Sequence, residues 1–145
     1  MVLNLETEVN GHFTEVFQGF TRELFQALNP PWVNVDLIRF DGCSVGDEVH
    51  LKLSLVGLSY DWVSVIDESV KEEKEIRFVD NGTVLPPPLK VWQHTHRIKD
   101  LGGNRSVIID NVYFGCANPL VEAAVAPGLY ATFAWRKPIY KKHFR

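Results

Sequence analysis

Cysteine is scarce in this chain of 145 residues, which contains only two. Cys43 and Cys116 lie far apart, and neither a Cys-x-x-Cys pair nor the Cys/His spacing of a zinc site occurs. Two isolated cysteines in a chain without an export signal are typical of free thiols that behave as small apolar groups. The cysteines therefore predict neither a disulfide framework nor a catalytic Cys/His pair.

Long apolar runs are also absent. No stretch reaches the roughly 18–20 consecutive apolar residues that a membrane-spanning helix needs. The N-terminus begins Met-Val-Leu-Asn and lacks the basic segment and the apolar core of a signal peptide. We therefore expect a cytoplasmic protein without an integral membrane segment.

The chain has no excess of positive charge. Lys and Arg number 15 against 18 Asp and Glu, and the formal net charge is -3, so no large basic field is available to attract phosphate backbones. The one locally basic stretch, residues 136–145, is interpreted as a solvated helix end. A glycine-rich phosphate loop and a Gly-x-Ser-x-Gly motif are missing too. The charge argues against nucleic acid as a partner, and the missing motifs leave a phosphate loop and a serine nucleophile without support.

The residues that are present describe one globular domain. Hydrophobic residues make up 46% of the chain and charged residues 23%, as in ordinary folded proteins. A chain of this length buries roughly 70% of the surface that its unfolded form exposes. We expect a single domain over residues 1–145, with one core or a core that contains a pocket.

The N-terminal part of the chain contains two patterns, one after the other. Apolar and polar residues alternate over residues 2–9, which predicts a strand. Over residues 12–28, the apolar residues recur at three- and four-residue spacings, which predicts a helical face. Gly19 divides this segment into two short helices, and Pro30 and Pro31 end it.

From there the pattern keeps a period of two until it becomes helical again near the C-terminus. The predicted strands are residues 33–40, 48–56, 60–68, 75–80, 90–98 and 105–114, and the predicted helix is residues 120–144, with a bend at Pro127-Gly128. The proline-rich segment 81–88 is expected to be a loop or an extended edge. Antiparallel strands followed by a covering helix define an α+β domain, in which seven curved strands and the helix leave space between them.

Three local motifs strengthen this interpretation. They are Phe-Val-Asp at 78–80, Leu-Pro-Pro-Pro-Leu-Lys-Val-Trp-Gln-His-Thr-His-Arg-Ile at 85–98, and Ile-Asp-Asn-Val at 109–112. With the order of elements, they resemble the START-like or Bet v 1-like (SRPBCC) superfamily, in its bacterial ligand-binding or cell-division-inhibitor-like branch. The chain departs from that branch where Pro86 replaces a glycine and Phe114 a tyrosine. The resemblance implies a helix-grip fold with a cavity under the C-terminal helix, as in hydrophobic-ligand-binding and polyketide cyclase-like proteins.

The candidate polar site lies on one strand face. Trp92, His94 and His96 share a face by the two-residue period. If the following hairpin turns symmetrically about Gly102, His94 lies opposite Asp110, and a carboxylate beside an imidazole would suit a general base. We favour a structural polar pair over catalysis, because buried polar groups normally find partners without doing chemistry. A metal site from the two histidines and the aspartate is a weaker alternative, and we expect no metal or cofactor.

The preferred function is the binding of a small hydrophobic or amphipathic ligand, such as a lipid, an isoprenoid or a polyketide-like molecule. Its predicted polar contacts are His94, His96 and Asp110, and its predicted apolar lining is Phe17, Phe20, Leu53, Trp62, Trp92, Leu129 and Phe133. One alternative is an acid/base cyclase, dehydratase or hydrolase that uses His94 as base and Asp110 to orient it. Another is an interaction protein with an apolar patch over residues 84–89. A homodimer is left open, and Asp80 is interpreted as a turn residue before Asn81-Gly82.

Overall fold

The computed structural model describes residues 1–145, and its elements follow the predicted order. The strands are β1 (Val2–Asn10), β2 (Asn34–Phe40), β3 (Glu48–Leu55), β4 (Leu58–Lys71), β5 (Glu75–Val84), β6 (Val91–Gly102) and β7 (Arg105–Gly115). The helices are α1 (Phe13–Gln18), α2 (Arg22–Ala27) and α3 (Pro119–His143). The predicted division of residues 12–28 into two short helices is therefore confirmed, with Gly19 as the cap that ends α1.

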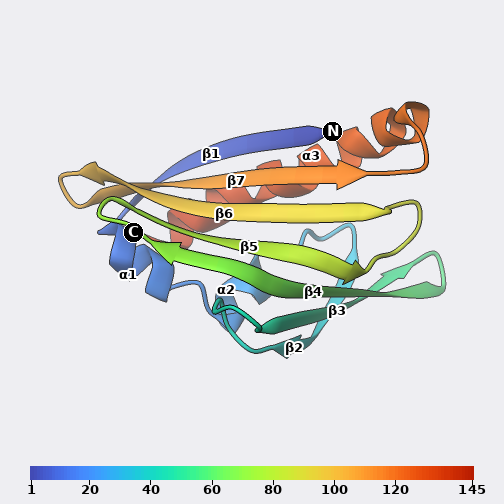
Figure 1. Ribbon diagram of the computed structural model, residues 1–145, viewed down its shortest axis with the longest axis horizontal. Coiled ribbons are helices and arrows are strands. Elements are labelled where there is room, and N and C mark those ends of the chain that lie inside the picture. The colour runs from blue at the N-terminus through green and yellow to red at the C-terminus, as the bar shows by residue number, and fades with distance from the viewer.

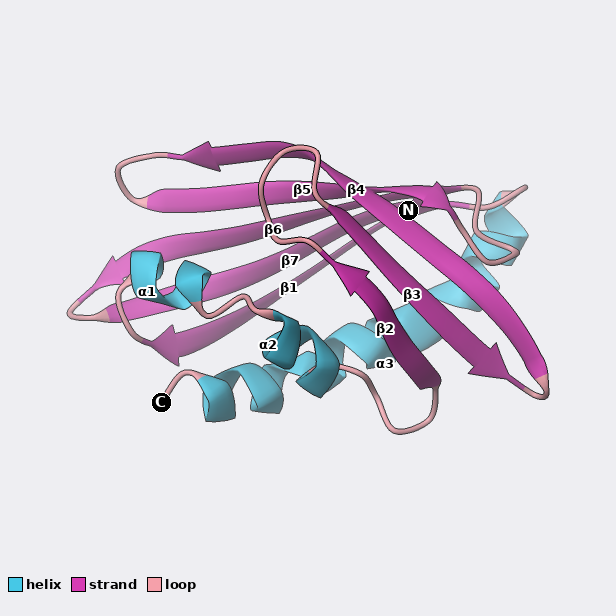
Figure 2. Ribbon diagram, turned by 90° about the horizontal axis from the view of Figure 1, so that it is seen from below, coloured by secondary structure: helices cyan, strands magenta, loops and turns pink.

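The seven strands form one antiparallel sheet, in the order β1-β7-β6-β5-β4-β3-β2 (Figure 1). Strand β1 returns to pair with β7, so that Leu5 lies opposite Asp110. The other strands pair with their neighbours in the chain. Figure 2 shows that the sheet is strongly curved and that β3 and β2 curl toward α3. The predicted α+β class with a curved seven-stranded sheet is confirmed.

The long helix α3 crosses one face of the sheet, and α1 and α2 lie on the same side (Figure 2). Asn118 caps α3 by accepting a hydrogen bond from the backbone N–H of Val121, and Pro119 occupies the first turn. The helix then continues through Pro127 and Pro138 as one element of 25 residues. Its length lets one helix cover the concave face of the sheet.

Buried side chains form two clusters between the sheet and the helices. The first packs α1 and α2 against the sheet and includes Phe20, Phe78 and Tyr140. The second joins Phe133 of α3 to Trp92 and other residues of the sheet. These clusters hold the two layers together, so any cavity between the layers is bounded by packed side chains.

The main differences from the predicted bounds lie in β4 and β5. Strand β5 was expected to end at Asp80, but it continues to Val84 because Asn81 and Gly82 keep their ladder partners on β4. Strand β4 extends to Lys71, beyond its predicted end at residue 68. The proline-rich segment is therefore shorter than predicted, and Asp80 lies inside a strand rather than in a turn.

None of the helices has both the length and the apolar character that crossing a membrane requires. Cys43 and Cys116 are free, as predicted.

Candidate functional site

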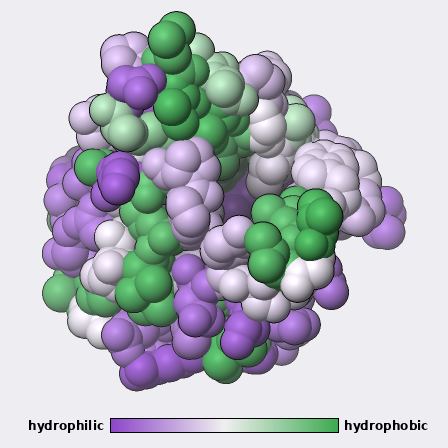
Figure 3. All heavy atoms as spheres, turned by 90° about the vertical axis from the view of Figure 1, so that its right-hand side faces the viewer, coloured by the Kyte–Doolittle hydropathy of each residue, from purple (hydrophilic) through white to green (hydrophobic).

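A cavity of about 260 Å³ lies between the concave face of the sheet and α3. It is lined by 26 residues, of which 17 are hydrophobic. Seen from the end that lies on the right of Figure 1, the molecular surface is hollowed near its centre, with hydrophobic side chains beside the hollow (Figure 3). The wall is mainly apolar, so the cavity favours an apolar or amphipathic occupant.

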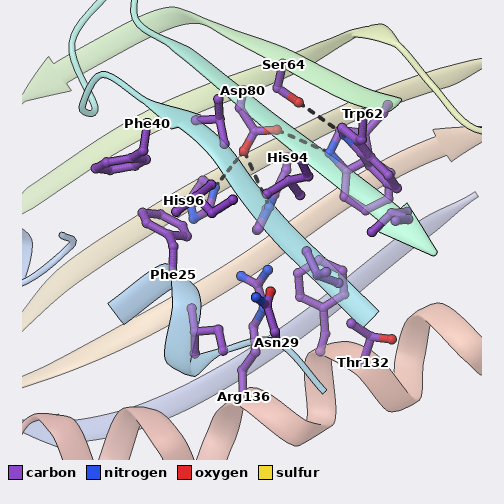
Figure 4. Close-up of a pocket in the computed structure, with 18 of the residues that line it drawn as sticks. Phe25, Asn29, Phe40, Trp62, Ser64, Asp80, His94, His96, Thr132 and Arg136 are labelled. Carbon is purple, nitrogen blue, oxygen red and sulfur yellow. Dashed lines mark hydrogen bonds and ion pairs between the residues drawn. The ribbon is translucent and has the colours of Figure 1, made fainter. Parts of the chain in front are cut away.

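One polar band interrupts the apolar wall on the sheet side. Asp80 on β5 and His94 on β6 are direct cross-strand partners, and His96 lies two residues further along β6 on the same face. Alternation along each strand places all three on the concave face, while Gln93, Thr95 and Arg97 turn outward. Figure 4 shows the two imidazoles next to each other, each joined to the Asp80 carboxylate by a dashed line.

Two carboxylates and two imidazoles interlock in this band. His94 Nε2 lies 2.8 Å from Asp110 Oδ1, and His96 Nε2 lies 2.8 Å from Asp80 Oδ2. His94 Nδ1 also lies 3.6 Å from Asp80 Oδ2, so both nitrogens of His94 face carboxylates. Trp92 Nε1 donates a hydrogen bond to Asp80 Oδ1 at 3.2 Å. Each buried carboxylate thus receives hydrogen bonds, as its burial requires.

These contacts set the charges of the band. Burial would raise the pKa of the Asp110 carboxyl, but the hydrogen bond with His94 and the charge of Arg136 outweigh burial and hold this pKa at about 2. The pKa of the Asp80 carboxyl is lowered in the same way: burial would raise it, but the hydrogen bond from His96 and the neighbouring histidines outweigh burial. Burial and the nearby His94 lower the pKa of His96 to about 4. At neutral pH the two aspartates are therefore ionised and His96 is neutral.

The helix side contributes a buried guanidinium. Arg136 Nη1 lies 3.6 Å from Asp110 Oδ1 and 3.5 Å from the Tyr140 hydroxyl, and that hydroxyl lies 3.5 Å from the same carboxylate oxygen. Burial lowers the pKa of Arg136, but Tyr140 and Asp110 outweigh burial and raise it overall. The guanidinium also lies over the Phe133 ring, 4.4 Å from its centroid. Figure 4 shows Arg136 reaching from α3 toward the histidines.

The predicted pairing of His94 with Asp110 is partly corrected. Asp110 lies directly opposite His96, and His94 lies opposite Val112, because the register shifts between Asp100 and Gly102 and the hairpin does not turn about Gly102. His94 nevertheless reaches Asp110 diagonally and contacts it. The two side chains therefore meet, although they are not cross-strand partners.

Most of the predicted lining residues lie on the cavity wall. They are Leu53, Trp62, Trp92, His94, His96, Leu129 and Phe133. Three lie elsewhere, and the expectation that they line the cavity is corrected. Asp110 lies outside the wall, in contact with His94 and Arg136. Phe17 and Phe20 pack on Phe78 in the first core cluster, because α1 is seated directly on the sheet.

Two residues of the band were missed from the sequence. Asp80 was interpreted as a turn residue, although Ile76, Phe78 and Asp80 follow the two-residue period of one strand face. Arg136 was assigned to a solvated basic tail, but its side chain is only 16% exposed. The spacing of Leu129, Phe133 and Arg136 follows one helical face and was the available signal.

The proline-rich segment does not form the apolar patch considered above. Val84 is exposed, but Leu85 packs against the second core cluster and Leu89 is buried.

The cavity wall also includes Cys43, whose thiol has its pKa raised to about 12 by burial. That thiol stays protonated at neutral pH and is a poor nucleophile.

Asp80, His94 and His96 could each offer one ligand atom to a metal ion, since these atoms lie within 4.8 Å of one another. A carboxylate and two imidazoles form a donor set that zinc accepts. A cation here would have to displace the short hydrogen bond between Asp80 and His96, and it would lie close to the Arg136 guanidinium. The present contacts satisfy the carboxylates without a metal.

No protein-family model matches the chain, and no curated protein matches its sequence. Solved structures do share its fold. The chain resembles protein Ms6760 from Mycobacterium smegmatis, with 16% identity and a TM-score of 0.67 over 99% of this chain and 90% of the other. It also resembles an aromatase/cyclase from Streptomyces sp. R1128, with 14% identity and a TM-score of 0.65 over 97% and 90% of the two chains.

A third similar structure is norcoclaurine synthase from Thalictrum flavum, with 15% identity and a TM-score of 0.64 over 99% and 95% of the two chains. Together these structures confirm that the chain has the START-like or Bet v 1-like helix-grip fold. At such low identity the likeness concerns the fold alone.

Proposed function

We propose that this protein binds a small amphipathic molecule in the cavity between the sheet and α3. The observation that carries the proposal is the cavity itself, a space of about 260 Å³ with a mainly apolar wall and one polar band. Ligand sites commonly combine an apolar lining with a few placed polar groups. The polar band orients one end of the ligand, and the apolar wall holds the rest.

The size of the cavity bounds the ligand. An engineered protein cavity of about 150 Å³ holds benzene, and pockets for drug-sized ligands start near roughly 300 Å³. A cavity of 260 Å³ therefore suits a molecule of about two fused rings or a short aliphatic chain. A long-chain lipid would need the cavity to enlarge or the chain to extend into solvent.

The alternative is an acid/base enzyme on the same scaffold, and the contacts of the two histidines favour His96 rather than His94 as its base. Both nitrogens of His94 face carboxylates, whereas His96 has its Nε2 held by Asp80 and its Nδ1 without a hydrogen-bond partner. If an imidazole here abstracts a proton, His96 is therefore better placed than His94. A histidine with a pKa of about 4 is a weak base, however, which favours binding over catalysis.

The test is native mass spectrometry of the protein purified from its own host, followed by denaturing extraction of anything retained. We expect a stoichiometric small amphipathic compound. Leu129→Trp should fill the cavity and abolish retention, while Tyr130→Trp, at the exposed neighbouring position on α3, should retain the compound. Equal retention by the two variants would place the compound outside the cavity and contradict the proposal.

Incubating the retained compound with the purified protein distinguishes binding from catalysis. After incubation with the purified protein, an unchanged compound supports a carrier or sensor. Conversion that is lost in His96→Gln and kept in the wild type would support the enzyme instead.

A further inference from the structure

Two buried polar atoms in residues of the cavity wall lack hydrogen-bond partners. They are Nδ1 of His96 and Nε of Arg136, and both residues line the cavity. The two residues come from opposite layers and both reach Asp110: His96 Nδ1 lies 3.9 Å from Asp110 Oδ1, and Arg136 Nη1, in the same guanidinium as Nε, lies 3.6 Å from it. Unpaired buried polar atoms are costly and call for an explanation.

The two atoms need opposite partners. His96 donates its Nε2 proton to Asp80, so its Nδ1 carries a lone pair and lacks a donor. Arg136 offers five N–H groups, and its one hydrogen bond, with Tyr140, is long at 3.5 Å. Its Nε has no acceptor. A hydroxyl group supplies both, because its proton donates to an acceptor while its oxygen accepts from a donor.

The charges around this place disfavour an anionic group. Asp80 and Asp110 are negative and Arg136 is positive, while His96 is neutral at pH 7. A carboxylate or phosphate on the ligand would add a further negative charge within a cavity that already has two buried carboxylates beside it. An ammonium group could donate to His96 Nδ1, but it has no lone pair to accept from Arg136 Nε. A neutral hydroxyl adds no negative charge and meets both needs.

We propose that the ligand carries a neutral phenolic or alcoholic hydroxyl that binds between His96 Nδ1 and Arg136, and that these two residues select it over acids and over hydrocarbons. This inference rests on the proposed function, because it names the polar end of the ligand held in the same cavity. Figure 4 shows Arg136 reaching from α3 toward the histidines, and 16% of its side chain is exposed.

A matched series of two-ring probes tests the selection. The probes are 2-naphthol, naphthalene and 2-naphthoate, and binding is measured at pH 7 by quenching of tryptophan fluorescence, since Trp62 and Trp92 line the cavity. We expect 2-naphthol to bind about tenfold or more tightly than either of the others, as a hydrogen bond to a charged donor supports. Equal binding of naphthalene, or tighter binding of 2-naphthoate, would overturn the selection. Failure of all three to bind would contradict the proposed cavity function itself.

Variants assign the preference to the two residues. In Arg136→Met, 2-naphthol should lose about tenfold in affinity while naphthalene is unaffected, and Lys137→Met, an exposed neighbour, should behave like the wild type. His96→Gln retains an amide to contact Asp80 and removes the Nδ1 acceptor, so it should show the same selective loss. If Arg136→Met does not fold, His96→Gln still decides, and an unchanged preference in a folded variant would refute the assignment.

Discussion

An imidazole and a carboxylate meet at two very different depths in this protein. His50 and Asp61 lie 3.1 Å apart on the surface, with side chains 32% and 51% exposed. His94 and Asp110 lie 2.8 Å apart with side chains only 3% exposed. Water competes for the first pair and is excluded from the second. Chemically similar contacts therefore contribute differently to folding.

We expect Asp110→Asn to lower the free energy of unfolding by about 3 kcal/mol, because it removes the carboxylate charge beside the buried Arg136 and weakens the hydrogen bond with His94. Asp61→Asn, at the exposed pair, should cost less than about 0.5 kcal/mol. Urea denaturation at pH 7 measures both. Equal losses for the two variants would show that burial does not strengthen the inner pair.

His96 also predicts a dependence of stability on pH. Its pKa is about 4 in the folded protein, below the roughly 6.5 of an unfolded histidine, so between these values the unfolded chain binds more protons. Stability should therefore be full above pH 6.5 and fall by about 3 kcal/mol as the pH drops to 4. Further loss follows below pH 4, where Asp110 approaches its folded pKa of about 2.

The measurement is urea denaturation of the wild type, His96→Gln and His143→Gln between pH 7 and pH 4. His96→Gln should flatten this part of the profile, whereas His143→Gln, which changes an exposed histidine, should leave its slope unchanged. If the stability of His96→Gln depends on pH as that of the wild type does, the acid sensitivity belongs to other groups.

Among the elements, the β3–β4 hairpin has a turn residue that does not suit the conformation of the turn. Leu55 and Leu58 close the hairpin, and Val56 and Gly57 between them both have positive φ angles, +49° and +77°. Positive φ at both central residues matches the tight turn that favours Asn-Gly. A β-branched side chain such as Val56 is strained there, and it is fully exposed, so no packing compensates for the strain.

Val56→Asn should therefore raise the free energy of unfolding by about 1 kcal/mol, because asparagine tolerates the left-handed conformation at lower cost. Thermal unfolding followed by circular dichroism measures the change. Val45→Asn is the control, since Val45 is also exposed but has no positive φ. An equal gain in the control would attribute the effect to the loss of an exposed apolar group.

The helix α3 contributes side chains to both core clusters and to the cavity wall. Phe133 packs in the second core cluster and Tyr140 in the first, and Arg136 lies between them in the cavity wall. One helical face therefore serves both as core and as half of the polar site. Changes that move α3 along the sheet should alter the cavity and the Arg136 contacts together.

For the whole molecule, a cavity between two packed layers means that a ligand should stabilise the fold. A ligand that binds only the folded state adds about 2.7 kcal/mol at a concentration one hundred times its Kd. We expect 2-naphthol to raise the thermal midpoint of the wild type and of Tyr130→Trp, and to leave Leu129→Trp unchanged. Differential scanning fluorimetry measures the shift, and an equal shift in Leu129→Trp would indicate binding away from the cavity.

The sequence by itself determined the features that local periodicity encodes. Alternation along β6 places Trp92, His94 and His96 on one face because successive side chains in a strand point to opposite sides. Gly19, Pro30 and Pro31 indicated the two short helices, and the helical spacing over residues 120–144 indicated α3. The order of these elements predicted a two-layer domain with a sheet under one helix, and the family resemblance implied the helix-grip fold with its cavity.

Only the tertiary structure decided which side chains meet. Asp80 joins the histidines because β5 continues past its predicted end and pairs with β6, and pairing is not visible from either strand alone. Arg136 enters the site because α3 packs across the sheet, which turns one residue of a basic tail inward. The cross-strand partner of Asp110 is His96 rather than His94, because the hairpin turns at Gly103-Asn104 and its register then shifts between Asp100 and Gly102. Register and packing depend on contacts between distant segments, so no local pattern could fix them.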